Sequence, residues 1–412
     1  MNKLYLGAAA LLLSTMTACM STFAGPATFG EDVAFLKGRV DTIVLSDAKG
    51  EAKIAVVPAY QGRVMTSTAA GNAGRSHGWV NRELIASGKP AERIHAFGGE
   101  DRFWIGPEGG QFSIFFAPGS GYDFDDWYTP APIDTEPFEL VESTSDRAVL
   151  KRRFTLTNKS STRFEVEIAR EIRLREAAQV LAAMRTELPE GVRGVAFESV
   201  NTITNVGRTA WKKETGLLSI WILGMFEASP ATTVVVPFQT GPTSARGRIV
   251  NDEYFGKVPP ERLRIDEARG LLLFKGDARH RSKIGVGPKR ARDVLGSWDE
   301  RNEVLTIVHY SLPRNPGAYV NSLWRHQDDP YDGDVVNSYN DGPAKPGEKG
   351  FGNFYELETS SPALALGPNE KATHSHRTIH LVGDRDGLAR VAKSVLGVEL
   401  EELDELEPAR DP

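Results

Sequence analysis

The stretch of residues 354–381, FYELETSSPALALGPNEKATHSHRTIHL, decides the fold class, because it alternates like strand sequence on both sides of a turn. Side chains alternate between the two faces of a strand, so its first half places Glu356 and Glu358 on one face. Gly367 and Pro368 supply the backbone angles of a turn. The second half places polar side chains on one face, at His374, His376, Thr378 and His380. The stretch therefore predicts two β-strands joined by a turn.

Two interpretations of these polar faces stay open. Two carboxylates on one strand and three histidines on a nearby strand have the chemistry of an acid/base wall. The alternative is that they are the ordinary polar surface of two sheet strands.

The same pattern of short β-prone runs and turn residues continues through most of the chain. Short β-prone runs separated by Gly, Pro, Asp and Asn predict strands at residues 42–46, 52–57, 62–67, 102–105, 111–116, 138–142, 148–156, 164–174, 195–204, 217–226, 232–238, 271–275, 294–298 and 304–311. The alternation shifts phase near Ala169, which indicates a bulge. Strands and helices do not alternate along the chain, which argues against a doubly wound parallel sheet. We therefore expect an all-β fold, one large antiparallel β-sandwich domain over residues 31–383.

Helices are expected only at a few places. Residues 81–87 predict a short helix within a long loop that spans residues 70–99, and residues 32–37 predict a short helix or turn. Residues 387–396 carry apolar side chains at helical spacing, so a short helix should open the C-terminal segment 384–412, with an acidic tail from Glu399 onward.

The N-terminal 18 residues have the pattern of an export signal. Lys3 precedes an apolar run at residues 6–13, and Met16-Thr-Ala-Cys19 follows it. A lone cysteine after a signal core resembles a bacterial lipoprotein signal, so we expect lipidation at Cys19, a tether over residues 19–30 and a membrane-anchored protein of the cell envelope. It would face the periplasm, more favourably on the outer than the inner membrane. The alternative is a secreted protein with a chance cysteine.

The composition excludes some partners and favours others. The formal net charge is −6, and no basic cluster with interleaved aromatic residues is present, so a nucleic-acid partner is not expected. Seven tryptophans with 40 Gly and 24 Pro suit a large β protein that has many turns and aromatic-lined surfaces.

Residues 95–111, HAFGGEDRFWIGPEGGQ, form the first candidate binding stretch. Two Gly pairs allow close approach of the backbone to a ligand, and the polar and aromatic side chains between them suit a sugar: Glu100, Arg102, Trp104, Glu108 and Gln111. The alternative is a hairpin with ion-paired side chains. The glycine spacing does not match a dinucleotide fingerprint.

Two further stretches are polar and aromatic. Residues 124–129 carry Trp127, which would line a pocket rim or be buried under a loop. Residues 321–342 form a long loop whose candidate ligand contacts are Arg325, Tyr339, Asn340 and Asp341. Its carboxylates also suit Ca²⁺, although the spacing lacks the offsets of an EF-hand, so no metal or other cofactor is predicted. His309 and His326 are candidates to point into the same site.

Together these motifs resemble the galactose mutarotase-like (aldose 1-epimerase) superfamily over residues 42–381. Leu357-Glu358-Thr359, the turn at residues 367–370 and the strand from His374 are similar to the family's Leu-Glu-Thr-Gln, Pro-Gly-Glu and His-Thr-Thr motifs. The resemblance implies a β-supersandwich with Glu358 as catalytic base. The family's general-acid histidine is Val206 here, and His77 and His95 are the nearest candidates for its other active-site histidine. The chain most resembles divergent bacterial relatives of unknown function.

Two functions follow as hypotheses. The first is an envelope lipoprotein that binds carbohydrate in a cleft and acts as a sugar epimerase or related enzyme, with Glu358 as base and His309, His326 or His374 as acid. In this hypothesis Glu356 lies beside Glu358 and contacts the sugar. The second is a glycan-binding or scaffold protein that performs no chemistry.

Overall fold

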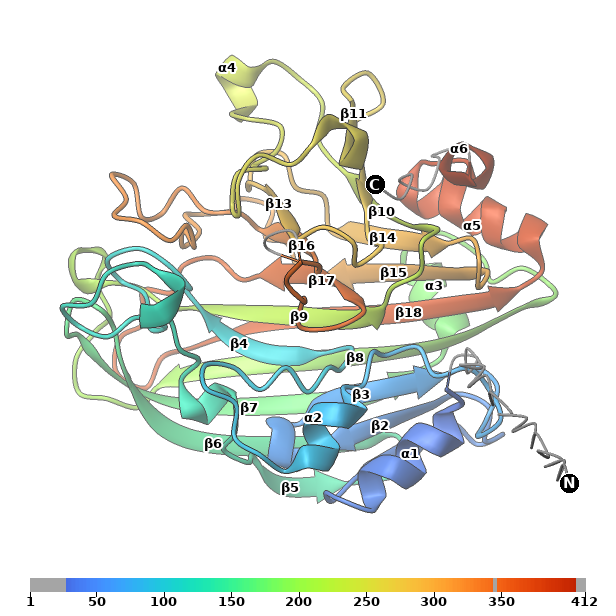
Figure 1. Ribbon diagram of the computed structural model, residues 1–412, viewed down its shortest axis with the longest axis horizontal. Helices are drawn as coiled ribbons and strands as arrows, with labels where there is room; N and C mark the ends of the chain where they lie inside the picture. Colours follow the sequence, from blue (N-terminus) through green and yellow to red (C-terminus); the bar gives the residue numbers. More distant parts are fainter. Residues whose placement is uncertain (1–26, 344–346, 405–412) are drawn as a thin grey trace, which may run out of the picture.

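Two antiparallel sheets, stacked face to face, form the body of the molecule (Figure 1). The structure is a computed structural model that describes residues 27–343 and 347–404. The larger sheet has ten strands, in the spatial order β11 (Leu263–Asp266), β12 (Leu271–Lys275), β10 (Thr232–Pro237), β14 (Val294–Asp299), β15 (Val304–Tyr310), β18 (Lys371–Gly383), β8 (Val192–Asn205), β7 (Arg163–Arg175), β6 (Arg147–Thr157) and β5 (Glu139–Ser143). This confirms the predicted all-β, antiparallel sandwich.

The second sheet has five strands and carries the site described below. Its order is β13 (Ser282–Val286), β16 (Val336–Asn340), β17 (Phe354–Ser360), β9 (Ser219–Glu227) and β4 (Arg102–Gly106). A three-stranded sheet extends the body beside it, in the order β1 (Ile43–Ser46), β2 (Lys53–Val57) and β3 (Arg63–Thr68).

Helices are short and peripheral (Figure 1). They are α1 (Phe29–Lys37), α2 (Arg82–Ser87), α3 (Ala177–Ala183), α4 (Thr243–Arg246), α5 (Arg385–Leu396) and α6 (Leu400–Asp404), with single 3₁₀ turns η1 (Pro58–Tyr60), η2 (Phe124–Asp126), η3 (Ala131–Ile133), η4 (Lys213–Thr215) and η5 (Pro260–Arg262). Within the described residues no helix is long and apolar enough to cross a bilayer.

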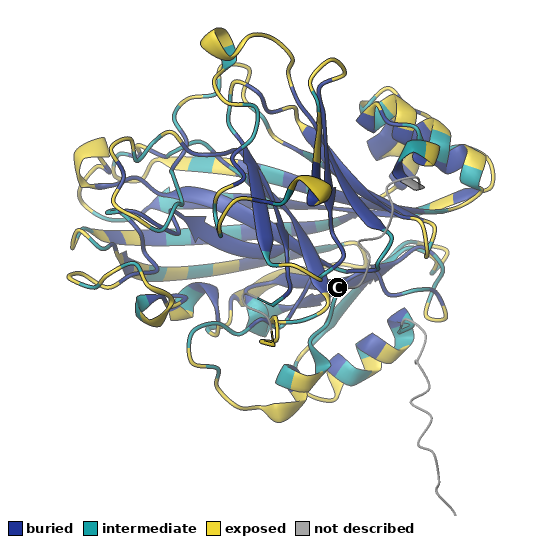
Figure 2. Cartoon of the chain, turned by 45° about the horizontal axis from the view of Figure 1, so that its top comes forward, coloured by how far each residue is buried: buried dark blue, intermediate teal, exposed yellow. Residues whose placement is uncertain are grey.

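The core lies between the stacked sheets, where the strands are almost wholly buried (Figure 2). From β17, the side chains of Tyr355, Leu357 and Thr359 point toward the ten-stranded sheet. The Tyr355 hydroxyl shares a 2.7 Å hydrogen bond with Ser297 of β14. Thr359 shares a 2.8 Å hydrogen bond with Nε2 of His374 in β18. Because side chains alternate, Glu356 and Glu358 must point the other way, out of this core.

Both strands predicted within residues 354–381 exist, but they lie in different sheets. β17 pairs with β16 and β9, whereas β18 pairs with β15 and β8 in the other sheet. The histidines of β18 therefore meet the Thr359 face of β17, and the carboxylates lie on its opposite face. No acid/base wall forms from these two strands.

Other predicted elements need correction. Residues 111–116 form turns rather than a strand, and the loop predicted over residues 321–342 contains β16; β13 was not predicted. The expected bulge near Ala169 is absent, because Arg170 continues the inward alternation of β7 in unbroken register with β6. Arg170 and its ion-pair partner Asp101 are both fully buried, so the pair places a charged residue where the pattern led us to expect an apolar one.

The ends of the described chain also differ in detail from expectation. α1 begins at Phe29, inside the predicted tether, and Thr28 with Glu31 forms a capping box at its start. The predicted C-terminal helix is confirmed as α5, with Asp384 as its N-cap and Gly397 in the left-handed conformation at its end. The tail continues into α6, and its last residues, like the predicted signal and Cys19, lie outside the described residues.

Candidate functional site: an aromatic cleft with a charged floor

The outer face of the five-stranded sheet forms the floor of a cleft. Strand register sets which side chains share this face, because residues directly opposite each other in a sheet point the same way. One row joins Lys283, Tyr339, Glu356 and Met225, and the next joins Asn337, Glu358, Leu223 and Arg102. A third pairs Trp221 with Trp104. Charged and aromatic side chains from all five strands therefore converge.

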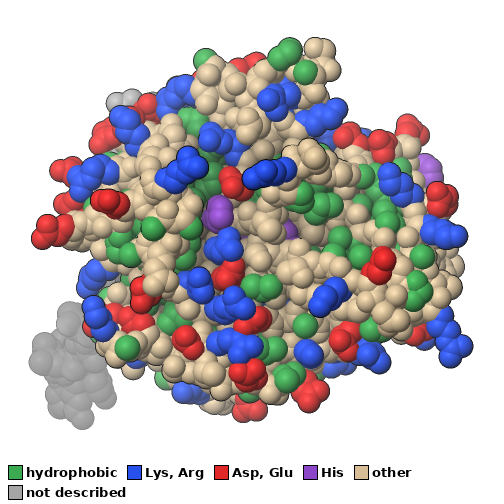
Figure 3. Space-filling model, turned by 180° about the vertical axis from the view of Figure 1, so that it is seen from behind, with side chains coloured by type: hydrophobic (Ala, Val, Ile, Leu, Met, Phe, Trp, Pro, Cys, Tyr) green, Lys and Arg blue, Asp and Glu red, His purple; other side chains and the backbone are tan. Residues whose placement is uncertain are grey.

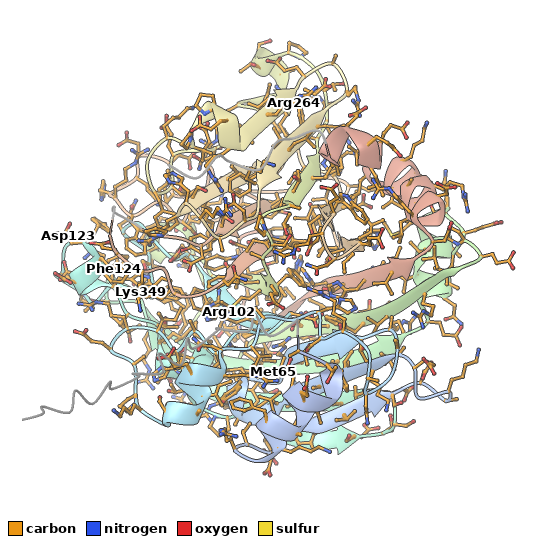
Figure 4. All side chains as sticks on the ribbon, turned by 45° about the vertical axis from the view of Figure 1, so that its right-hand side comes forward. Met65, Arg102, Asp123, Phe124, Arg264 and Lys349 are labelled. Carbon is orange, nitrogen blue, oxygen red and sulfur yellow. The ribbon has the colours of Figure 1, made fainter. Side chains whose placement is uncertain are left out.

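Loops build aromatic walls above this floor. The cleft has an empty volume of about 560 Å³, which includes solvent at its mouth, and it is lined by Ile94, Ala96, Arg102, Trp104, Glu108, Phe124, Trp127, Trp221, Leu223, Met225, Phe255, Arg281, Lys283, Trp324, Tyr339, Phe351, Phe354 and Glu356. Trp127 and Trp324 stack with ring centroids 5.6 Å apart. Figure 4 labels Arg102 on the sheet and Phe124 among the loops at the left-hand end. Four of the seven tryptophans thus gather around one cavity.

An ion pair lies at the centre of the floor. Arg102 Nη2 donates to Glu356 Oε1 at 2.8 Å, and the Arg102 guanidinium lies 4.1 Å from the centroid of the Trp104 ring. Burial raises the pKa of Glu356 to about 8, with a further contribution from Glu358, although Arg102 opposes the shift. Near neutral pH this carboxyl group is therefore able to hold a proton.

Glu358 lies beneath the cleft rather than in its lining, and its side chain is fully buried. Its Oε2 accepts hydrogen bonds from Trp221 Nε1 and Lys283 Nζ, both at 2.9 Å, while Oε1 has no partner among the described residues. Burial alone would lower the pKa of Lys283, but Glu358 and Glu108 raise it above its usual value. Glu358 therefore holds Lys283 and Trp221 in place from below.

Glu108 reaches the cleft from the loop after β4. Burial raises the pKa of its carboxyl group, and the nearby charge of Glu358 adds to that shift while Lys283 opposes it. Within the described residues, no hydrogen bond of the Glu108 carboxyl group is found. Glu108 and Glu356 are therefore the carboxyl groups that line the cleft itself.

The cleft brings together six predicted site residues: Arg102, Trp104, Glu108, Trp127, Tyr339 and Glu356. The other predicted residues of these stretches do not line the cleft. Asn340 and Asp341 are buried, and Asp341 accepts from the Tyr339 hydroxyl at 2.7 Å. Gln111 bonds to the backbone of Gln327, and Arg325 is exposed outside the lining.

The predicted histidines do not line the cleft. His374 is 1% exposed between the two sheets, where burial and the neighbouring His376 lower its pKa to about 3. His309 contacts Arg377 at 3.0 Å on the ten-stranded sheet, and His326 is exposed in its loop. None of these three histidines lines the cleft, so none is placed to act there as the predicted acid.

The nearest histidine candidates also have other partners. His77 stacks on His380 at 4.4 Å, and His380 Nε2 lies 2.7 Å from Oε2 of the fully buried Glu100, whose pKa burial raises to about 7. His95 Nδ1 lies 2.7 Å from Asp134. Among the described residues no cluster of His, Cys, Asp or Glu is arranged to hold a metal ion.

Sequence reasoning missed several cleft residues, above all Arg281, Lys283, Trp221 and Trp324. Residues 281–286, RSKIGV, do alternate, and that alternation was the available signal for Arg281 and Lys283 on one strand face.

The face of the molecule opposite to Figure 1 shows acidic and basic side chains interspersed (Figure 3).

Solved structures with a similar fold share little sequence with this chain. A protein from Escherichia coli K12 named as a candidate aldose 1-epimerase is 11% identical, with a TM-score of 0.48, covering 84% of this chain and 99% of that one. A galactose mutarotase-like protein from Lactobacillus casei is 10% identical, with a TM-score of 0.44, covering 82% of this chain and 100% of that one.

No curated protein matches the chain. Residues 27–407 match a family of unknown function, DUF6786, and because this match covers most of the sequence, the chain belongs to that family.

Proposed function

We propose that the cleft binds a carbohydrate. The observation that carries the proposal is the set of four tryptophans placed around the Arg102–Glu356 ion pair in one cavity. Sugars present apolar C–H faces that stack on aromatic rings, and hydroxyl groups that pair with charged side chains in two-pronged fashion. The indole N–H groups of Trp104 and Trp127 are buried and have no partner among the described residues.

The carboxyl groups suit acid–base chemistry on the bound sugar. Mutarotation needs one group to protonate the ring oxygen and another to take the proton of the anomeric hydroxyl; the ring then opens and closes again. Burial raises the pKa of Glu356 to about 8, so near neutral pH Glu356 can donate the proton, and in this proposal Glu108 is the group that accepts one. In this proposal Glu358 positions Lys283 and Trp221 and does not touch the sugar.

A second candidate function is glycan capture without chemistry. It is favoured by one contact, the 2.8 Å ion pair that occupies Glu356 Oε1. In either case we propose that the chain is an envelope lipoprotein anchored through Cys19, on the strength of the Met16-Thr-Ala-Cys19 sequence.

The test is a panel of mono- and oligosaccharides titrated into the protein by calorimetry, with anomer exchange of each bound sugar followed by NMR. Trp324→Ala should weaken sugar binding about tenfold, because it removes a partly exposed stacking surface from the cleft wall. Leu140→Ala is the matched control, since Leu140 is 40% exposed on β5, outside the cleft lining.

The outcomes separate the two candidates. Exchange catalysed by the wild type and lost in Glu356→Gln supports the epimerase. Binding without exchange supports capture. Failure of every sugar to bind, or equal binding by Trp324→Ala and the wild type, would overturn the carbohydrate proposal.

A further inference from the structure

One basic side chain of the cleft forms no ion pair with any described residue. Arg281 lies directly before β13 and is half-buried, and its guanidinium sits 4.2 Å from the centroid of the Phe255 ring. In the part of the chain that the structure describes, Arg281 makes no hydrogen bond and no ion pair, and its Nε is buried without a partner. Stacking on an aromatic ring holds the guanidinium in place but leaves its N–H donors unused.

The acidic groups around Arg281 are occupied elsewhere. Asp341 accepts from the Tyr339 hydroxyl and from the backbone N–H of Gly352, both at 2.7 Å. Glu356 is paired with Arg102, and Glu358 with Lys283. Each of the other two cleft cations therefore has a carboxyl group at ion-pair distance, whereas Arg281 has none among the described residues.

Glu108 neutralises the charge of Arg281 less than an exposed glutamate would at the same pH. Burial raises the pKa of its carboxyl group, so the neutral form is favoured relative to an ordinary glutamate. The same holds for Glu356, whose pKa is raised to about 8. Of the three cations in the lining, Arg102 and Lys283 each lie within ion-pair distance of a carboxyl group, and Arg281 does not.

Three donors at the cleft have no partner among the described residues. Trp104 and Trp127 are only 3% and 5% exposed, and their indole N–H groups lack partners among the described residues, as does Nε of Arg102. Buried donors are costly to leave unpaired, which favours acceptor oxygens over further donors near these groups.

We propose that the ligand is an anionic sugar, whose carboxylate, sulfate or phosphate group binds the guanidinium of Arg281 while its ring lies against the tryptophans. This proposal rests on the carbohydrate function proposed above and names the substrate class. A planar guanidinium with free N–H donors matches the oxygens of such a group in two-pronged geometry.

The experiment compares matched sugars that differ only in charge. Methyl galactoside, methyl galactosiduronate and the 6-sulfate and 6-phosphate of methyl galactoside, and the corresponding glucose series, are titrated into the wild type, Arg281→Gln and Arg314→Gln. Arg314 is the control because it is exposed and lies outside the cleft lining. Loss of a charge-assisted hydrogen bond should weaken anionic sugars about 10- to 100-fold in Arg281→Gln, with neutral sugars changed less than about twofold.

Salt dependence gives a readout that needs no variant. Wild-type affinity for the anionic sugars should fall as NaCl rises, while affinity for neutral sugars stays flat. This readout also keeps the proposal testable if Arg281→Gln does not fold. The order of affinity among carboxylate, sulfate and phosphate identifies which anion the cleft takes.

Failures of the two proposals are distinct. Neutral sugars that bind as tightly as their anionic partners, or anionic sugars that bind Arg281→Gln as well as the wild type, would overturn this inference and leave the carbohydrate function standing. If no sugar of either kind binds, the carbohydrate function itself fails.

Discussion

Glu356 is the residue whose protonation changes the charge of the cleft near physiological pH. Its folded pKa of about 8 lies above the ordinary glutamate value of 4.5, and burial is the main cause. A carboxyl group with a raised folded pKa contributes stability that is fully present below the unfolded pKa. That stability is lost as pH rises toward the folded pKa.

The free energy of unfolding should therefore decline between about pH 4.5 and pH 8, by up to about 1.4 kcal/mol per pH unit for this one proton. Glu356→Gln should remove that share of the slope in urea unfolding measured across this range. Glu100, whose pKa is raised to about 7, contributes a slope of the same sign that remains in the variant. A slope that is identical in Glu356→Gln and the wild type would contradict the assignment.

At the same scale, sequence reasoning found cleft residues where polar and aromatic side chains stand between glycine pairs, as with Arg102, Trp104 and Glu108. It could not identify which buried charges pair with each other. Arg170 looks like a break in the alternation of β7, yet it is an inward residue paired with Asp101, a partner 69 positions away. Such a partner is set by tertiary packing, which no local pattern contains.

Among the elements, most strands could be predicted, because alternation and turn residues are local signals. The partner of each strand could not. β17 and β18 are separated by ten residues, and each has the same alternation whether it pairs with its neighbour in sequence or with strands of another sheet. Only the stacked arrangement sends the carboxylates of β17 to the cleft and its threonine to the histidines of β18.

The segment that carries Phe255 is held at the cleft by a buried polar contact. The Tyr254 hydroxyl donates to Asp334 at 2.6 Å and accepts from Asn337 of β16 at 3.1 Å. Tyr254→Phe should lower the free energy of unfolding by about 1–2 kcal/mol, since Asp334 and Asn337 each lose a partner. It should also weaken sugar binding, because Phe255 follows directly in the cleft wall.

Thermal unfolding and calorimetric titration of Tyr254→Phe check these two effects together. Tyr128→Phe is the matched control, since Tyr128 is 38% exposed and lies outside the cleft lining. Unchanged affinity in Tyr254→Phe would show that the Tyr254–Asp334 contact does not position this wall.

For the whole molecule, composition and strand texture predicted one large antiparallel sandwich, and the stacked sheets confirm it. The cleft could be predicted only in part, because its lining comes from five strands and several loops spread over residues 94–356. No single stretch contains the cleft, and the histidines of β18, which the sequence suggested as acid/base groups, are buried between the sheets instead.

The anchoring proposal also concerns the molecule as a whole. When the full chain is expressed in a Gram-negative host, wild-type protein should fractionate with membranes and carry a diacylglyceryl group on Cys19, visible by mass spectrometry of the N-terminal peptide. Cys19→Ala should abolish the lipid and release the protein from the membrane fraction. Lipid-free wild-type protein in the soluble fraction would contradict the proposal.

The most direct test of the central claim, that the aromatic cleft binds sugar, is tryptophan fluorescence during titration with neutral and anionic sugars. Four of the seven tryptophans line the cleft, so its occupation should change the emission in a saturable way, and Trp324→Ala should reduce both the amplitude and the affinity. Emission that stays constant at saturating concentrations of every sugar in the panel would contradict the claim.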